Sequence, residues 1–415
     1  MAIKSIRFSN FKSFAETELQ LRSFNVIVGS NASGKSNLVS ALRFLRDTAA
    51  NELDNAISLQ GGIKYLRNIK IGPTRPLTIE LVTDRKREVF IPTKEAGHYL
   101  RLNTDQITHK LMLTFKKRRL SDYEVAESLV EMTGQLETYK AHADRFDKIR
   151  DVGVGTVRFQ LLLGKPFFNI HAPDLQVSEQ SLFVPYLPVR ETKRLVYGHV
   201  PLFFEASDEF RDIALYDFDT KLPKKAVPIT PKADLSEDGS NLALVLRSVT
   251  EDSEKNRMFS NLFKALLPFI DKVGVDKFAD KSMLFKVRER YFGSEFLPAS
   301  LVSDGTISIA ALILALYFGT KTTIILEEPE RNIHPSLIAG VVEMMKDASR
   351  TRQIILTTHN PEVVKHAGIE NLFLISRDSD GFSTLVRPSD KEQVQSFLKS
   401  DIGVDDLFAS NLLDA

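Results

Sequence analysis

The stretch FNVIVGSNASGKSN, residues 24–37, contains the pattern that decides the fold. Its apolar, β-branched beginning predicts a buried strand that ends at Gly29. The loop that follows fits G-x-x-x-x-G-K-S, in which small residues let backbone N–H groups turn toward phosphate oxygens. Leucines at helical spacing then predict a helix from Lys35 to about Arg46, whose N-terminal dipole faces the same phosphates. A chance glycine turn is the alternative, but strand, loop and helix in register favour a nucleoside-triphosphate site.

The side chains of this loop have separate expected roles. Lys35 is expected to place its charge on the β- and γ-phosphates, and the Ser36 hydroxyl is expected to ligate Mg²⁺. ATP and Mg²⁺ are therefore the expected ligands. The other residues expected to line the nucleotide are Gly29, Ser30, Asn31, Ala32, Ser33, Gly34 and Asn37.

The composition is that of an ordinary folded protein with a large core. Of the 415 residues, 43% are hydrophobic and 26% are charged, with a formal net charge of +1. Any nucleic-acid contact therefore has to be a local patch. The absence of cysteine excludes disulfides, thiolate zinc sites and a cysteine nucleophile, and it suits a reducing cytoplasm. No signal peptide or membrane span is expected, because no apolar run approaches about 18 residues. The expected location is the cytoplasm.

Outside this stretch, the apolar pattern predicts strands and a helical arm. Residues 122–150 are polar and charged, with apolar residues at helical spacing, so one or two exposed helices are expected there. The basic run at 116–119 is expected to be a solvated face or, alternatively, a patch that follows a phosphate backbone. Three prolines make Lys221–Pro231 a predicted linker. Strands are predicted at Ile3–Ser9, Thr17–Leu21, Leu77–Thr83 and Ile107–Phe115, a hairpin at Val157–Leu163 and Phe167–Ile170, and helices at Asn241–Val249 and Met258–Ile270.

Two buried strands in the second half end in groups that a phosphate site needs. Thr323–Glu328 is a continuous apolar strand that ends in two carboxylates, where ligands bind in parallel sheets. We expect Glu327 to contribute to the coordination shell of Mg²⁺, and we expect Glu328 to orient and deprotonate the attacking water. An acidic helix start is the alternative. The second strand, Gln353–Thr357, leads to His359, which is expected to contact the γ-phosphate rather than to be a buried core histidine.

A third motif, Ser303-Asp304-Gly305-Thr306, precedes the strongly apolar segment Ile307–Phe318, which is predicted to be a helix. A Ser/Asp/Gly cluster that caps a helix is common and means little alone. Its position shortly before the acidic strand end gives it more weight.

In this order, the motifs resemble those of ATP-binding-cassette ATPases of the SMC/RecF type. More narrowly, they resemble the stand-alone AAA group that includes the OLD-type ATPases of prokaryotes. The resemblance covers roughly residues 1–50 and 296–362. The matching segments are the opening IKSIRFSNFKSF, the Walker A loop GSNASGKSN, the signature LVSDGT, the Walker B strand and D-loop IILEEPERNIHP, and the switch segment LTTHNP.

The resemblance implies an α/β fold, that of an ABC/SMC-type P-loop ATPase head with a mixed sheet and antiparallel N-terminal strands. In such ATPases two heads dimerise head-to-tail, so each nucleotide lies between the Walker motifs of one subunit and the signature of the other. By this resemblance the trans signature would be Ser303, Asp304 and Gly305, the D-loop at the dimer interface would include Glu330, Arg331 and Asn332, and Lys12 would reach the nucleotide.

Three regions are expected: an N-terminal lobe of the head at 1–95, an inserted mixed α/β region at 96–235 with a short helical arm, and a C-terminal lobe at 236–415. The chain departs from the family pattern at Ala32, where many relatives have glycine, and at Glu327, where transporters have aspartate. Both residues suit the chemistry. No segment matches the long coiled coil of SMC proteins.

Two functions remain open. The first is a slow ATPase that serves as sensor or scaffold for a separate effector, a nuclease, in prokaryotic anti-phage defence. The second is a DNA-binding clamp for repair or recombination. A transporter subunit is disfavoured, because the interval between Lys35 and Ser303 is far longer than a transporter head needs. The residues after His359 are expected to be too few for the TOPRIM nuclease domain of OLD proteins, and Leu407–Leu413 is expected to be a final packing helix or a docking peptide.

Overall fold

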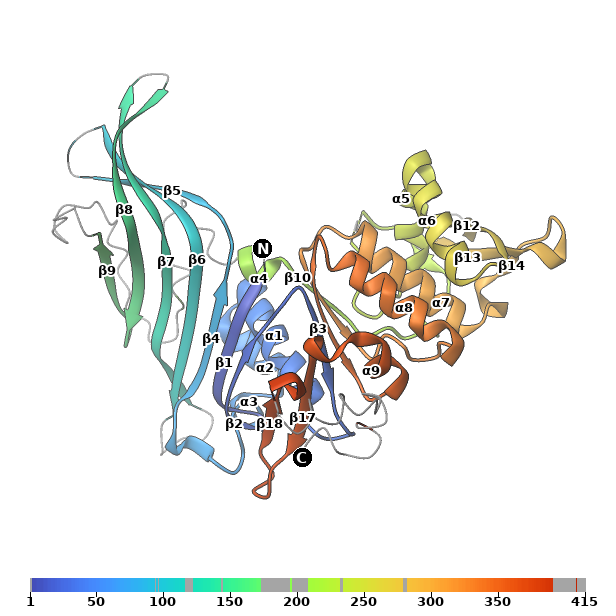
Figure 1. Cartoon of the computed structure of the whole chain (residues 1–415), viewed down its shortest axis with the longest axis horizontal. Helices are drawn as coiled ribbons and strands as arrows, with labels where there is room; N and C mark the ends of the chain where they lie inside the picture. Colours follow the sequence, from blue (N-terminus) through green and yellow to red (C-terminus); the bar gives the residue numbers. More distant parts are fainter. Residues whose placement is uncertain are drawn as a thin grey trace. The chain divides into compact units, whose positions relative to one another are not determined.

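The computed structural model describes residues 2–93, 95, 97–115, 122–142, 145–172, 195, 208–231, 234–278, 282–390 and 408. The chain divides into two compact units, whose elements are drawn in Figure 1. The first unit contains residues 1–22, 37–212 and 377–385, and the second contains residues 23–36, 213–376 and 386–415. One of the boundaries in the sequence falls just after the phosphate loop, between Ser36 and Asn37.

The first unit is built on an eight-stranded antiparallel sheet. Its strands are β1 (Ile3–Phe11), β2 (Phe14–Gln20), β4 (Leu77–Thr83), β5 (Glu88–Pro92), β6 (His98–Phe115), β7 (Tyr123–His142), β8 (Arg145–Leu162) and β9 (Lys165–His171). The order is β2-β1-β4-β6-β7-β8-β9, with β5 paired to β6. The helices of this part of the chain are α1 (Lys35–Ala50), α2 (Leu53–Leu59), α3 (Ile63–Leu66), the short 3₁₀ turn η1 (Gly72–Thr74) and α4 (Asp208–Arg211).

Residues 122–150, predicted as helices, form β7 and the start of β8 instead. The prediction is wrong because a bulge changes which residues face the core. Two consecutive residues of β6 pair with Glu127 and Val125, so the extra residue Ala126 shifts the alternation by one. Buried side chains fall on odd positions before the bulge and mainly on even positions from 128 to 136. This change of phase imitates helical spacing.

The second unit is built on a parallel sheet in the order β10-β15-β16-β3-β17. Its strands are β3 (Phe24–Val28), β10 (Ile213–Tyr216), β15 (Thr323–Glu327), β16 (Gln353–Thr358) and β17 (Leu372–Arg377), and β18 (Ser383–Val386) follows in the chain. The three central strands are buried almost along their whole length. They therefore read as continuous apolar runs, as central strands of parallel sheets do.

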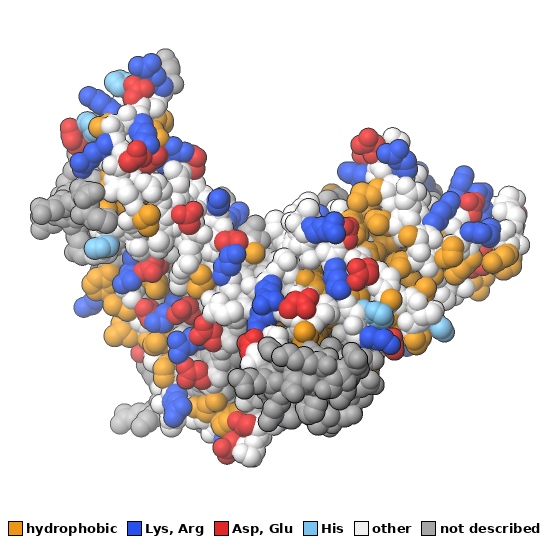
Figure 2. Space-filling model, in the orientation of Figure 1, with side chains coloured by type: hydrophobic (Ala, Val, Ile, Leu, Met, Phe, Trp, Pro, Cys, Tyr) orange, Lys and Arg blue, Asp and Glu red, His pale blue; other side chains and the backbone are white. Residues whose placement is uncertain are grey.

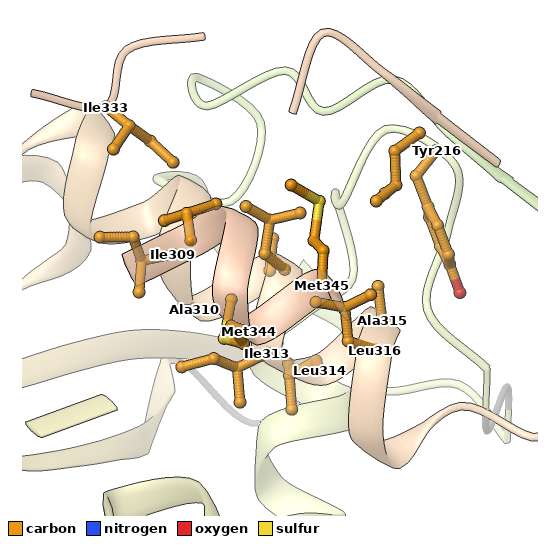
Figure 3. Packing of buried hydrophobic residues seen from close by; sticks show 14 of the residues in the cluster. Tyr216, Ile309, Ala310, Ile313, Leu314, Ala315, Leu316, Ile333, Met344 and Met345 are labelled. Atoms are coloured by element: carbon orange, nitrogen blue, oxygen red, sulfur yellow. The ribbon is translucent and has the colours of Figure 1, made fainter. Parts of the chain in front are cut away.

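Helices and a small antiparallel sheet complete the second unit. The helices are α5 (Leu242–Glu251), α6 (Ser253–Leu266), α7 (Asp304–Ile313) with its π-helical continuation η6 (Leu314–Phe318), α8 (Pro335–Ala348), α9 (Pro361–Ala367) and the short turns η4 (Arg290–Phe292), η5 (Ala299–Leu301), η7 (Ile369–Asn371) and η8 (Pro388–Asp390). The small sheet consists of β11 (Val227–Pro228), β12 (Ile270–Phe278), β13 (Ser282–Glu289) and β14 (Leu297–Pro298). Figure 3 shows apolar side chains of α7 and η6 lying beside Met344 and Met345 of α8, in one buried cluster.

Most of the strand predictions are confirmed, including β4 at its predicted bounds and the β8–β9 hairpin. The predicted linker Lys221–Pro231 is instead folded, because β11 within it pairs with β13. The predicted helix Ile307–Phe318 begins earlier, at Asp304. The basic run 116–119 and, apart from Phe408, the segment 407–413 lie outside the described residues. Of the helices in the described ranges, none has the length and apolar character needed to cross a bilayer.

Candidate functional site

Three strands of the second unit end side by side at one edge of its parallel sheet. β16 pairs in parallel with β15 on one side and with β3 on the other, so the residues that follow these strands meet at the same edge. Two backbone bonds hold the segments together there. Gly29 N–H donates to the carbonyl of Thr358 at 3.3 Å, and Glu328 N–H donates to the carbonyl of Thr357 at 3.0 Å.

The loop before Lys35 holds the lysine ammonium against its own backbone. Nζ donates to the carbonyls of Gly29 at 2.8 Å and Ser30 at 2.9 Å, and the residue is only 7% exposed. Burial lowers the pKa of Lys35, against the opposing effect of the Glu328 and Glu330 carboxylates. The ammonium is thus already placed to exchange two carbonyl partners for phosphate oxygens.

The backbone of this loop requires small residues and left-handed conformations. A Cβ on Gly29 would lie 2.3 Å from the carbonyl oxygen of Ile375 and 2.9 Å from Ser33 Oγ. Gly34 has a φ of 120°, which glycine adopts readily. Ala32 has a φ of 64°, a left-handed conformation that costs an L-residue with a side chain roughly 1 kcal/mol or more.

Ser36 and Glu327, the two residues predicted to hold Mg²⁺, both carry oxygen donors. Ser36 is the second residue of α1 and is exposed, and Glu327 ends β15 half-buried. A hydroxyl and a carboxylate are hard oxygen donors of the kind that Mg²⁺ prefers. The donor set at this edge therefore fits a magnesium-bound triphosphate.

Glu328 is held on both of its carboxylate oxygens. Oε1 lies 2.8 Å from Nδ1 of His359, and Oε2 accepts from the Arg331 guanidinium at 3.2 Å. Burial acts to raise the pKa of Glu328, but these two partners outweigh it and hold the pKa below its usual value. Glu328 is therefore ionised at neutral pH, the form that a general base requires. Its φ of 44° is a strained conformation of the kind that occurs at functional sites.

Glu330 is buried within its own chain, although the resemblance places it at a dimer interface. It is 6% exposed, and Thr358 Oγ1 donates a hydrogen bond to its carboxylate. Burial raises the pKa of Glu330, against the effect of this hydrogen bond. Thr358 Oγ1 also accepts from the backbone N–H of Asn360 at 2.9 Å. Glu330 thereby ties its own segment to the one that carries His359.

The signature motif forms the start of α7. Ser303 is the exposed N-cap, and its Oγ accepts from the Thr306 N–H at 3.2 Å. Asp304 Oδ1 lies 2.5 Å from Lys224 Nζ, and this partner is the main reason why the pKa of Asp304 is lowered. The motif thus presents a hydroxyl and a helix N-terminus at the surface.

Gly305 lets the signature touch the predicted D-loop segment of the same chain. A Cβ at Gly305 would lie 2.7 Å from the carbonyl oxygen of Asn332. Ser308 Oγ donates to the carbonyl of Arg331 at 3.3 Å, so a second bond joins the two segments. The side chains of Arg331 and Asn332 are exposed.

Lys12 and Asn37 belong to the first unit and make their described contacts there. The Asn37 amide donates to Ser13 Oγ at 2.8 Å. Burial, and then the charge of Arg43, lowers the pKa of Lys12, whose backbone carbonyl accepts from the Asn68 amide at 2.7 Å. Both predicted nucleotide contacts therefore hold the turn after β1 in shape.

A family model described as "AAA domain, putative AbiEii toxin, Type IV TA system" matches residues 24–365, from the phosphate loop to beyond His359. The chain belongs to this AAA-domain family. It is an ATPase of the AAA type, and the strand edge described above lies within the residues that the family model matches.

Two curated proteins and two solved structures are similar to this AAA-domain ATPase. An ATP/GTP phosphatase of Helicobacter pylori (strain ATCC 700392 / 26695) is 22% identical over 88% of this chain and 86% of its own length. The Old nuclease of Escherichia phage P2 is 22% identical over 96% of this chain, which spans 63% of that protein. An Smc head bound to the C-winged helix domain of ScpA matches with a TM-score of 0.51 and 14% identity, covering 93% of this chain and 98% of that one. The Smc head with an extended coiled coil, bound to the C-terminal domain of ScpA derived from Pyrococcus furiosus, matches with a TM-score of 0.50 and 13% identity over 96% and 99%. The predicted ABC/SMC-type head fold is confirmed.

Sequence reasoning missed two residues that contact the motifs of this ATPase. Lys224 pairs with Asp304 of the signature, and Asp217 pairs with Arg331 at 3.2 Å. Both come from the stretch after β10, in which Lys224 lies within the predicted linker Lys221–Pro231 and Asp217 lies just before it. Their partners are distant in the sequence, so no local pattern could have pointed to them.

Proposed function

We propose that this AAA-domain ATPase closes head-to-tail as a dimer around ATP and Mg²⁺, and that its cycle regulates a separate effector protein. The observation that supports hydrolysis most directly is the ionised Glu328, paired with His359 at the strand edge that also carries the phosphate loop. A base, a phosphate-binding ammonium and an oxygen pair for magnesium are then available to one substrate.

In this proposal each residue of the edge has a separate task. Lys35 would bind the β- and γ-phosphates, and Ser36 and Glu327 would hold a magnesium ion, which would supply positive charge to the phosphate oxygens. Glu328 would accept a proton from the attacking water, and His359, which orients the Glu328 carboxylate, would contact the γ-phosphate.

The dimer would complete the site with the signature of the second copy. Ser303 is exposed at the N-terminus of α7, where its hydroxyl and the helix dipole can stabilise negative charge on a phosphate held by another subunit. The exposed Arg331 and Asn332 beside it would contribute to the same interface.

We further propose that the effector is a nuclease and that the system acts in prokaryotic anti-phage defence. The family description names an AbiEii toxin, and a similar protein is the Old nuclease of phage P2. The alternative is a DNA-binding clamp, which the basic run at 116–119 favours. On the face drawn in Figure 2, however, Lys and Arg side chains are interspersed with Asp and Glu rather than gathered.

Pull-down with a trapped ATPase tests this proposal. Glu328→Gln protein, tagged and loaded with ATP, should retain a specific second protein from its native host, and Lys35→Ala protein should not. The effector proposal is wrong if the trapped form retains duplex DNA alone, because the clamp then accounts for the ATP dependence.

A further inference from the structure

The loop after β10 contacts both halves of the proposed composite site within one chain. Its first residue, Asp217, accepts from the Arg331 guanidinium at 3.2 Å. Its last, Lys224, lies 2.5 Å from Asp304 of the signature. We refer to residues 217–224 as the bridging loop.

The bridging loop is folded by contacts within itself and with its neighbours. Phe218 stacks on Tyr216 with ring centroids 5.3 Å apart. Asp219 accepts from two backbone N–H groups of the loop, that of Lys221 on its side chain at 2.9 Å and that of Leu222 on its carbonyl at 3.1 Å. Thr220 is buried, 5% exposed. These contacts make the loop a short rigid connection between its two ion pairs.

Arg331 connects the bridging loop to Glu328, the proposed general base. Its guanidinium lies between Asp217 and Glu328, at 3.2 Å from each carboxylate. The sequence of contacts is therefore Glu328, Arg331, the bridging loop and Asp304. In a head-to-tail dimer, Glu328 faces the nucleotide of its own chain, whereas Asp304 faces the nucleotide held by the other chain.

We propose that the bridging loop couples the two composite sites of the dimer, with Arg331 as the positioning residue that orients Glu328. This inference rests on the proposed head-to-tail function. When the signature of a chain closes on its partner's ATP, Asp304 moves Lys224, the rigid loop moves Asp217, and Arg331 resets the orientation of the Glu328 carboxylate. A contiguous path of ion pairs with a rigid element between them is a physical basis for such coupling.

A dimer with one functional site tests the coupling. One chain carries Glu328→Gln, which should bind ATP without hydrolysing it, and the other carries the functional Walker motifs with or without Lys224→Met. Dimers are purified through two different tags. Lys224 of the second chain then faces only the disabled site, so an effect on turnover has to travel through the bridging loop. We expect at least about a fivefold loss of turnover, the lower end of coupling between sites, with ATP affinity unchanged. Lys225→Met, an exposed lysine one residue away, is the matched control.

Unchanged turnover in the Lys224→Met dimer, or an equal loss with Lys225→Met, overturns the coupling. If dimers with one site do not turn over at all, a double-mutant cycle in the homodimer tests the coupling instead. Asp217→Asn and Lys224→Met should each lower kcat, and the kcat of the double variant should be no lower than that of the poorer single variant. Additive effects contradict a shared path, and retained activity in Asp217→Glu supports it. The Asp217–Arg331 pair is half-exposed and the Lys224–Asp304 pair is partly exposed, so both contribute little to folding and these variants should be stable. If wild-type and Lys35→Ala proteins hydrolyse ATP equally, the proposed function itself fails, and this inference fails with it.

Discussion

Glu330 offers a test of the buried side of the nucleotide site through the pH dependence of stability. Its carboxylate is 6% exposed, and no hydrogen-bond partner of Oε2 is found among the described residues. Burial raises the pKa of Glu330 above the usual 4.5. An acid whose folded pKa is raised favours folding in its protonated form. The contribution of protonated Glu330 to stability should therefore be fully present below about pH 4.5 and should be lost as pH rises through the folded pKa.

Glu330→Gln keeps the shape and the acceptor for Thr358 but cannot ionise. A buried polar group without a full set of hydrogen bonds lowers the free energy of unfolding by about 1–3 kcal/mol. Ionisation of the buried carboxylate adds a cost of this size, and only the wild type can ionise. The difference in unfolding free energy between variant and wild type should thus change by about 1–3 kcal/mol in favour of the variant between pH 4 and pH 8.

Chemical denaturation followed by fluorescence or circular dichroism across this pH range measures the difference. Glu343→Gln, at a carboxylate with 68% side-chain exposure, is the control and should show no such slope. A difference for Glu330→Gln that stays constant with pH would show that folding does not shift the pKa of Glu330, and it would refute the raised pKa that we attribute to its burial.

Three further results are expected. Ala32→Gly should raise the unfolding free energy by up to about 1 kcal/mol and keep ATP turnover, because glycine removes the strain at φ 64°; a clear loss of stability in denaturation would contradict this. Ser303→Arg should leave ATP binding intact, measured by fluorescent nucleotide titration, but should prevent ATP-dependent dimerisation in light scattering, and full turnover by this variant would argue against the trans signature. The purified chain should leave plasmid, linear and single-stranded nucleic acid intact with Mg²⁺ or Mn²⁺, and cleavage should require an added partner; cleavage by the isolated chain that is lost in a variant outside the ATP site would place a nuclease centre in it.

The edge of the parallel sheet that carries the nucleotide site was predictable from the sequence because its signals are local. A G-x-x-x-x-G-K-S loop after an apolar strand, and carboxylates at the end of another, specify their own backbone and chemistry. The parallel sheet then brings Lys35, Glu328 and His359 to one edge without further information. The helix N-cap at Ser303 was equally predictable, since a serine before an apolar helix is a local signal.

The remaining features depend on contacts that no local pattern encodes. The strands at 122–150 looked helical because the bulge at Ala126 changes the phase of the burial pattern. The end of the bridging loop lies in Lys221–Pro231, which was predicted as a linker because of its three prolines, and the partners of Lys224 and Asp217 lie far along the chain. Glu330 is acidic and adjacent in sequence to the exposed Arg331, yet its carboxylate is buried and accepts a hydrogen bond from Thr358 at the end of β16.

The central claim is that Glu328 is the base of an ATP site whose Lys35 holds the phosphates. The most direct test is a single-turnover experiment with radiolabelled ATP on wild-type, Glu328→Gln and Lys35→Ala proteins, with retained nucleotide analysed after rapid gel filtration. The account predicts that wild type releases ADP and phosphate, that Glu328→Gln retains intact ATP, and that Lys35→Ala gives no hydrolysis. Glu328→Gln protein that hydrolyses ATP at the wild-type rate, or that fails to retain ATP at all, would contradict it.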